Sequence, residues 1–219
     1  MNILQQIGKK TNTDKSRHTY KGLSYLDIYD GHFNSIRHDV KCFVEIGVLS
    51  GASVKMWSEY FPNATIYGID IDPRCKQYET DKIKILIGDQ NDDDFLKQAQ
   101  DELPPIDIFL DDGSHITSHQ IKTFEYLNAK ITRNGFFVIE DLRNSYDDFN
   151  KGCDLRKIWP GMALNKADDD LKNYRADFND WCFEMIKKLD FHDSNFPLFS
   201  LHFYPMILIL EHKACKEII

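Results

Sequence analysis

The stretch KCFVEIGVLSGASVKMW, residues 41–57, combines an apolar run, a glycine-bearing turn and an amphipathic continuation. The apolar run at 41–47 is short and bounded by glycine, which predicts a buried strand. Residues 52–60 continue with the spacing of a helix that covers one face of a sheet. This strand–turn–helix unit predicts the start of an α/β fold.

The same alternation recurs outward from this unit. Further buried strands are predicted at residues 65–71, 83–87, 106–110 and 135–139. Helices are predicted at 92–102 and 117–130, and strands that alternate with helices indicate a parallel sheet covered on both faces. The last apolar runs, 198–204 and 206–211, are separated only by Pro205 and predict an antiparallel hairpin at the sheet edge. We therefore expect a Rossmann-like, mostly parallel seven-stranded sheet that ends in this hairpin.

Neither an internal repeat nor a low-complexity linker divides the chain, so we expect a single domain over residues 1–219. Its expected parts are a short, polar-rich N-terminal helical cap at 1–40, the core at 41–143, an insertion with a helix at 144–189, of which the helix covers 167–189, and the C-terminal hairpin at 190–219.

Composition narrows the function classes. The formal net charge is −8 and Lys/Arg runs are missing, which argues against a nucleic-acid or membrane-surface partner. The five cysteines are scattered and odd in number, as expected for reduced thiols in the cytoplasm. The N-terminus lacks a signal peptide, and the apolar run at 206–210 is too short to span a membrane. We expect a soluble cytoplasmic protein.

The turn at 45–51 indicates which ligand the fold binds. A dinucleotide fingerprint would place glycines at positions 47, 49 and 52, but Leu49 and Ala52 occupy the last two. The turn is therefore poorly suited to a pyrophosphate. S-adenosylmethionine carries no phosphate and has a positive sulfonium. A turn with the acidic Glu45 followed by Gly47 and Gly51 therefore suits it better than it suits a dinucleotide.

Two further strand ends supply groups for an adenosine. Asp70 follows the second strand, where a carboxylate can accept hydrogen bonds from ribose hydroxyls. Asp89 and Gln90 follow the third strand, where a side-chain acceptor can meet the adenine amine. The register of these residues favours a bound S-adenosylmethionine over a plain structural turn.

Acidic residues follow the fourth and fifth strands. Asp112, Glu140, Asp141 and His115 should converge there, because neighbouring parallel strands end side by side. Three carboxylates in a small space repel one another unless a cation lies among them, and oxygen ligands suit Mg²⁺, Mn²⁺ or Ca²⁺. His115 could then accept the proton of an acceptor hydroxyl. The alternative is that these residues only cap the following helices.

The motifs EIGVLSGASVKMW, YGIDID, GDQND, DDGSHITSHQIKTF and VIEDL occur in this order and spacing. Together they resemble the macrocin/mycinamicin-type sugar O-methyltransferases over residues 11–147. The segment Thr13-Asp14-Lys15, with His18 and Tyr20, resembles the TDK-type segment of that family. The resemblance implies a class I methyltransferase fold and a transfer of methyl to a sugar hydroxyl that depends on Mg²⁺ or Mn²⁺.

Carried over by position, the resemblance implies that His115 is the base. It implies that the metal ligands are Asp112, Glu140 and Asp141. Together with the turn and the strand ends, it gives the expected S-adenosylmethionine contacts: Glu45, Gly47, Ser50, Gly51, Asp70, Asp72, Asp89, Gln90 and Asp111. The expected substrate contacts are Lys15, Tyr20, His119 and Tyr146.

The sequence does not decide which acceptor is methylated. Only about forty residues precede the first strand, fewer than in the macrolide-modifying members, which favours a sugar nucleotide or a surface-polysaccharide sugar over their glycosylated metabolites. A phenol, phosphoramidate or hydroxy acid is an alternative acceptor, and a non-catalytic nucleoside-binding module is another reading. A short-chain dehydrogenase, suggested by Tyr126 and Lys130, lacks its pyrophosphate turn. A homo-oligomer is compatible with the sequence but not required by it.

Overall fold

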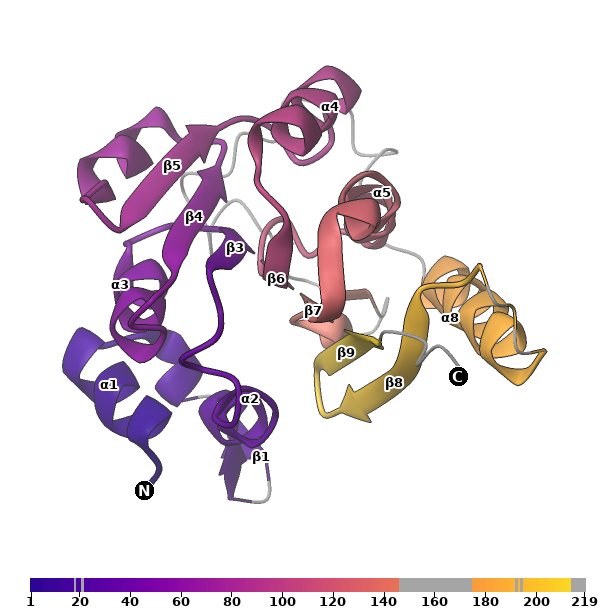
Figure 1. The fold of residues 1–219 in the computed structure, drawn as a ribbon, viewed down its shortest axis with the longest axis horizontal. Coiled ribbons are helices and arrows are strands. Elements are labelled where there is room, and N and C mark those ends of the chain that lie inside the picture. The colour runs from indigo at the N-terminus through magenta and orange to yellow at the C-terminus, as the bar shows by residue number, and fades with distance from the viewer. Residues whose placement is uncertain (18, 21, 146–174, 192, 194, 214–219) are drawn as a thin grey trace, which may run out of the picture.

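The computed structural model describes residues 1–213 except 18, 21, 146–174, 192 and 194 (Figure 1). A seven-stranded sheet with the order β5-β4-β3-β6-β7-β9-β8 forms its centre. The strands are β3 (Cys42–Ile46), β4 (Thr65–Asp70), β5 (Ile83–Ile87), β6 (Ile106–Asp111), β7 (Ile131–Ile139), β8 (Leu198–Tyr204) and β9 (Ile207–His212). The five strands β3 to β7 are parallel, and β9 and β8 add an antiparallel hairpin. The predicted Rossmann-like α/β fold is confirmed.

Helices cover both faces of this sheet (Figure 1). The helices α1 (Ile3–Thr11), α2 (Tyr25–Phe33) and α3 (Ala52–Tyr60) lie on one face, and α4 (Asp93–Glu102), α5 (Thr117–Leu127) and α8 (Arg175–Asp190) lie on the other. Successive residues of a strand point to opposite faces, so Phe43 packs with the first group and Val44 with the second. Both are fully buried, as expected for a parallel sheet.

The N-terminal segment is helical, as expected, but it is not a polar cap. Leu4 of α1 and Leu26, Tyr29 and Phe33 of α2 are buried in the same hydrophobic cluster as Trp57 of α3. A two-stranded hairpin, β1 (Thr19–Tyr20) and β2 (Leu23–Ser24), stands between the two helices in sequence. The segment is therefore part of the core, and its many polar residues lie on the outer helix faces.

Some boundaries differ from the prediction. Strand β7 begins at Ile131, four residues earlier than expected, because Ile131 pairs with Ile106 before the exposed Arg133 and Asn134 interrupt the apolar pattern. Short 3₁₀ turns, η2 (Pro73–Tyr78), η3 (Asn128–Lys130) and η4 (Leu142–Ser145), occupy three connections. The first part of the predicted helix at 167–189 lies outside the described residues. Within the described part, every helix is too short or too polar to cross a membrane.

Candidate active site

The candidate site lies at the carboxyl ends of β3, β6 and β7. From β3 the chain moves outward to β4 and β5, then returns to β6 and β7 on the other side. Ile46 pairs with Asp111 across β3 and β6, and Asp111 pairs with Ile139 across β6 and β7. Open parallel sheets bind ligands where the strand order reverses in this way. The predicted side-by-side placement of these strand ends is confirmed.

The turn after β3 owes its shape to a glycine and a carboxylate. Gly47 has a φ of 96°, and a Cβ here would stand 2.1 Å from the carbonyl oxygen of Asp112. The backbone N–H groups of Val48 and Leu49 donate to Asp70 Oδ2 at 2.9 and 3.0 Å. The turn is therefore fixed without any ligand, and it lies directly against the loop that carries Asp112.

The residues predicted to contact S-adenosylmethionine fall into two groups. The exposed or half-buried group comprises Gly47, Ser50, Asp70, Asp72 and Asp89. The buried group comprises Glu45, Gly51, Gln90 and Asp111. The first group is therefore accessible to a ligand, and the side chains of Glu45, Gln90 and Asp111 in the second group form hydrogen bonds within the protein.

The side chain of Gln90 forms hydrogen bonds within the protein on both sides of its amide group. Its amide nitrogen donates to Asp111 Oδ2 at 2.7 Å and to Thr123 Oγ1 at 3.2 Å, and its Oε1 accepts the N–H of Ser114 at 2.9 Å. Burial raises the pKa of Asp111 to about 6, against the opposing hydrogen bond from Gln90. Gln90 thus braces the loop after β6, and the exposed Asp89 is the better placed of the two for the predicted adenine contact.

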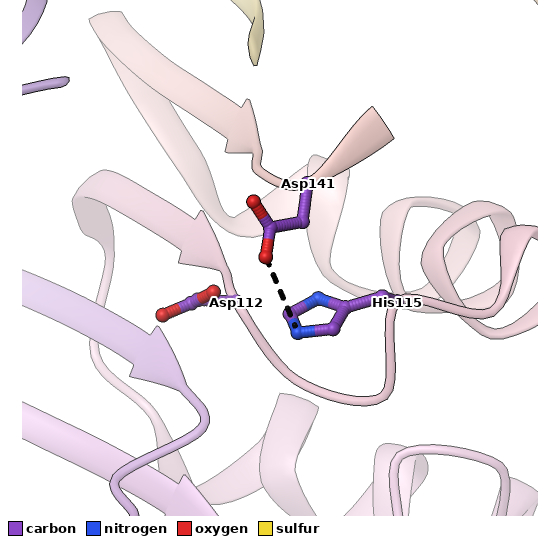
Figure 2. A group of neighbouring side chains, drawn as sticks. All are labelled: Asp112, His115 and Asp141. Carbon is purple, nitrogen blue, oxygen red and sulfur yellow. Dashed lines mark ion pairs between the residues drawn. The ribbon is translucent and has the colours of Figure 1, made fainter. Parts of the chain in front are cut away.

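Asp112, His115 and Asp141 form a compact group (Figure 2). Each offers one ligand atom, and these atoms lie within 4.8 Å of one another. His115 Nε2 lies 3.6 Å from Asp141 Oδ2, and Tyr25 donates its hydroxyl to Asp141 Oδ1 at 2.8 Å. Both His115 and Asp141 have a φ of 57°, in the left-handed region that non-glycine residues seldom adopt. Such backbone conformations persist where the surroundings enforce them, often at functional sites.

Glu140 lies beside this group but makes different contacts. Lys15 donates to its Oε2 at 2.8 Å, and the hydroxyl of Tyr29 donates to its Oε1. The Lys15 ammonium also donates to Asp112 Oδ2 and lies 3.6 Å from Glu45 Oε1. The four residues predicted from the sequence therefore converge as expected, and a buried lysine joins them.

Burial and charge shift the pKa of these groups. Burial raises the pKa of Glu45 to about 7, although the nearby Lys15 ammonium opposes the shift. Burial and the charge of Asp112 likewise raise the pKa of Glu140. Burial by itself would lower the pKa of Lys15, but the carboxylates of Asp112, Glu140 and Glu45 outweigh it and raise that pKa above its ordinary value. The pocket therefore favours positive charge.

The donor set fits a divalent cation. The carboxylates of Asp112 and Asp141, with the His115 imidazole beside them, leave coordination positions for water or for an acceptor oxygen. Asp112 and Asp141 both belong to this group, and Lys15 brings its one positive charge to Asp112. Mg²⁺ and Mn²⁺ are the cations whose preference for oxygen ligands matches the site best.

The predicted substrate contacts are scattered. Lys15 is only 1% exposed, so its ammonium faces the carboxylates and not an open substrate pocket. Tyr20 of β1 is 55% exposed. His119 of α5 shares a hydrogen bond with Ser114 Oγ through its Nδ1, at 2.9 Å. Tyr146 lies outside the described residues.

The roles of Tyr25 and Tyr29 were not predicted from the sequence. They are four positions apart on α2, so they lie on one helix face and reach Asp141 and Glu140 together. Burial, followed by the charge of the contacted carboxylate, raises the pKa of both phenols and keeps them protonated donors. The spacing was the available signal, but it equally describes a core-facing aromatic pair.

Known proteins resemble this chain in sequence and structure. The 8-demethyl-8-alpha-L-rhamnosyl tetracenomycin-C 2'-O-methyltransferase of Streptomyces olivaceus is 30% identical over 87% of this chain and 50% of the relative. The mycinamicin VI 2''-O-methyltransferase of Micromonospora griseorubida is 36% identical over 62% of this chain and 33% of the relative. The solved structure of the MycE methyltransferase with Mg, SAH and mycinamycin VI has a TM-score of 0.74 at 26% identity, over 97% of this chain and 55% of that one. No family model matches the sequence.

The sheet order, the C-terminal hairpin and the glycine turn after β3 define a class I methyltransferase fold. Within that class, the chain is similar in sequence to the macrocin/mycinamicin-type family of sugar O-methyltransferases. It spans about half the length of the tetracenomycin relative and a third of the mycinamicin relative.

Proposed function

We propose that the protein is an S-adenosylmethionine-dependent O-methyltransferase that uses Mg²⁺ or Mn²⁺ and methylates a sugar hydroxyl. One observation carries the proposal: the group Asp112, His115 and Asp141 adjoins the glycine turn at a single switch point of the sheet. The close approach of Gly47 to the carbonyl oxygen of Asp112 makes the two parts neighbours. A methyl donor on the turn and an acceptor in the pocket would therefore meet.

His115 is the proposed base. Its side chain is 11% exposed, and its Nε2 lies 3.6 Å from Asp141 Oδ2. A neighbouring carboxylate orients the ring and stabilises the imidazolium that forms when His115 accepts a proton. In the transfer, the acceptor oxygen bonds to the methyl carbon while the sulfur–carbon bond breaks. The hydroxyl proton passes to His115, and S-adenosylhomocysteine and a methyl ether are the products.

Asp112 and Asp141, with the predicted ligand Glu140, would hold the cation. Bound there, a divalent cation would make the acceptor hydroxyl more acidic. Tyr25 holds Asp141 from its other oxygen, and Lys15 holds Asp112, so both carboxylates keep their orientation. This preorganisation supports catalysis by positioning, the main contribution expected for an in-line methyl transfer.

A sugar is the proposed acceptor because the relatives act on glycosylated compounds. The tetracenomycin relative is a methyltransferase of a rhamnosyl tetracenomycin, and it matches most of this chain. A sugar presents neighbouring hydroxyls, and two of them can approach one cation. We therefore favour a sugar carried on a small molecule over a phenol or a hydroxy acid.

The experiment uses the purified protein, labelled S-adenosylmethionine and a panel of glycosides, sugar nucleotides, phenols and hydroxy acids. We expect label in a glycoside or sugar nucleotide, loss of transfer in EDTA and recovery with Mg²⁺. Thermal shifts supply a control, because S-adenosylhomocysteine should raise the melting temperature and NAD should not. Transfer to phenols alone would contradict a sugar as the acceptor. Full activity in EDTA would contradict the requirement for a divalent cation.

A further inference from the structure

Lys15 is the least expected member of the pocket. It stands in a short 3₁₀ turn, η1 (Asp14–Ser16), between α1 and β1. The hydroxyl of Ser16 donates to the carbonyl oxygen of Thr13 at 2.7 Å, and the N–H of Thr13 donates to the carbonyl oxygen of Gly8 at 3.2 Å. These bonds tie the turn to the end of α1. These contacts hold the backbone of Lys15 in place independently of its side chain.

The Lys15 ammonium meets residues from the ends of three neighbouring strands. It contacts Asp112 after β6, Glu140 after β7 and Glu45 within β3. Moving an ammonium into such a buried position is costly unless carboxylates surround it. The surrounding carboxylates meet that condition, so the lysine is held by charge as well as by shape.

Each of the two buried glutamates accepts a hydrogen bond from a neutral donor on one of its oxygens. Ser53 donates to Glu45 Oε2 at 2.7 Å, opposite the oxygen that faces Lys15. Tyr29 donates to Glu140 Oε1, again opposite the oxygen bound by Lys15. Glu140 therefore has one neutral donor and a hydrogen bond from the ammonium, whereas Glu45 Oε1 lies 3.6 Å from the ammonium and has no hydrogen-bond partner within the described part of the chain.

Asp112 has a divided role. Its Oδ2 accepts from Lys15, and its carboxylate also belongs to the group with His115 and Asp141. A divalent cation in that group would lie close to the Lys15 ammonium, and like charges repel strongly where water is scarce. Lys15 and a divalent cation would therefore repel each other while both contact the carboxylate of Asp112.

We propose that Lys15 is a built-in cation of the metal site. This inference rests on the proposed function, since it assumes that a divalent cation binds there. Lys15 is a positioning residue in two respects: it keeps Glu45 and Glu140 assembled when no metal is present, and its charge keeps the metal weakly bound and exchangeable. The N-terminal segment therefore sets the metal affinity of a site formed by β6 and β7.

Mn²⁺ titration followed by the electron paramagnetic resonance of the free ion tests the inference without methyl transfer. The protein is saturated with S-adenosylhomocysteine, and wild type, Lys15→Met, Lys15→Arg and Lys10→Met are compared. Lys10 is an exposed helix lysine paired with Glu59 at 2.8 Å, and it serves as the matched control. We expect Lys15→Met to bind Mn²⁺ about tenfold more tightly or better, because a repelling charge is removed. Lys15→Arg and Lys10→Met should stay close to wild type.

A lysine that merely packs the pocket predicts the opposite sign, since its loss would disorder the ligands and weaken Mn²⁺ binding. Equal or weaker binding by folded Lys15→Met would therefore overturn the inference. Melting temperatures give a second measurement: in EDTA the Lys15→Met variant should melt below wild type, and Mn²⁺ should raise its melting temperature more than that of wild type.

If Lys15→Met does not fold, the double variant Lys15→Met/Glu45→Gln replaces it and is compared with Glu45→Gln alone, because Glu45 faces Lys15 but is not a predicted metal ligand. The double variant should bind Mn²⁺ more tightly, and equal or weaker binding would reject the inference. The proposed function fails differently. In that case wild type would neither bind Mn²⁺ nor transfer methyl, whereas failure of the inference alone leaves both intact.

Discussion

The glycine turn after β3 and the acidic pocket after β6 and β7 adjoin each other, yet different forces hold them. The turn is fixed by backbone hydrogen bonds to Asp70 and by the close approach of Gly47 to Asp112. The pocket is fixed by carboxylates around Lys15. The close approach of Gly47 to Asp112 does not depend on pH or on a metal, whereas the charge pairs of the pocket depend on both. In the proposed function, the turn would hold S-adenosylmethionine and the pocket would hold the cation and the acceptor.

The largest expected effect separates chemistry from cofactor binding. His115→Ala should lower the turnover number by about a hundredfold to ten-thousandfold, the usual contribution of a general base. Binding of S-adenosylhomocysteine, measured by calorimetry, should stay unchanged because the turn does not depend on the imidazole. His38→Ala, at an exposed position before β3, is the control and should keep the activity. Loss of cofactor binding in His115→Ala would show that the two regions do not act independently.

A steric change should damage the turn itself. Gly47→Ala places a Cβ against the carbonyl oxygen of Asp112 at a φ of 96°, so overpacking and backbone strain add. We expect the free energy of unfolding in urea to fall by about 3 kcal/mol. Gly31→Ala is the matched control, since Gly31 lies within α2 with open space around it and alanine there should stabilise by about 0.5 kcal/mol or more. Equal stability of the two variants would contradict the steric account of the turn.

The sequence predicted the strands and their ends well because the physics there is local. Buried parallel strands are apolar on both faces, so a run such as 106–110 stands out, and Asp111 and Asp112 mark its end. Convergence then follows from the geometry of a parallel sheet. Nothing beyond the order of the strands is needed to place Asp112 near Glu140.

The contacts of Lys15 could not be derived in this way. Lys15 is 97 positions from Asp112 and 125 from Glu140, and it comes from a segment outside the alternating pattern. A lysine in a polar segment ordinarily predicts exposure, because burying an ammonium is favourable only with partners in place. The contribution of the N-terminal segment to the core was not predicted, for a related reason. Polar residues on the outer faces of α1 and α2 surround apolar positions such as Leu4 and Leu26, which are fully buried.

Glu45 lies in β3 just before the turn, and its carboxylate faces Lys15 of the pocket. The smallest expected effect concerns the protonation of Glu45. Burial first, and then the charge of Asp112, raise the pKa of Glu45 from 4.5 to about 7, against the opposing effects of Lys15 and Ser53. A raised pKa means that folding favours the protonated acid. The stabilisation is therefore complete at low pH and is lost as the pH rises through 7.

Glu45→Gln is the matched variant, because it keeps an acceptor for Ser53 and cannot ionise. In EDTA, the free energy of unfolding of wild type should fall relative to Glu45→Gln by about 2 kcal/mol between about pH 5 and about pH 8. The exposed Glu59→Gln should track wild type. A wild-type protein that gains stability over Glu45→Gln as the pH rises would mean that Lys15 outweighs burial at Glu45, and the charge balance of the pocket would then extend into the turn.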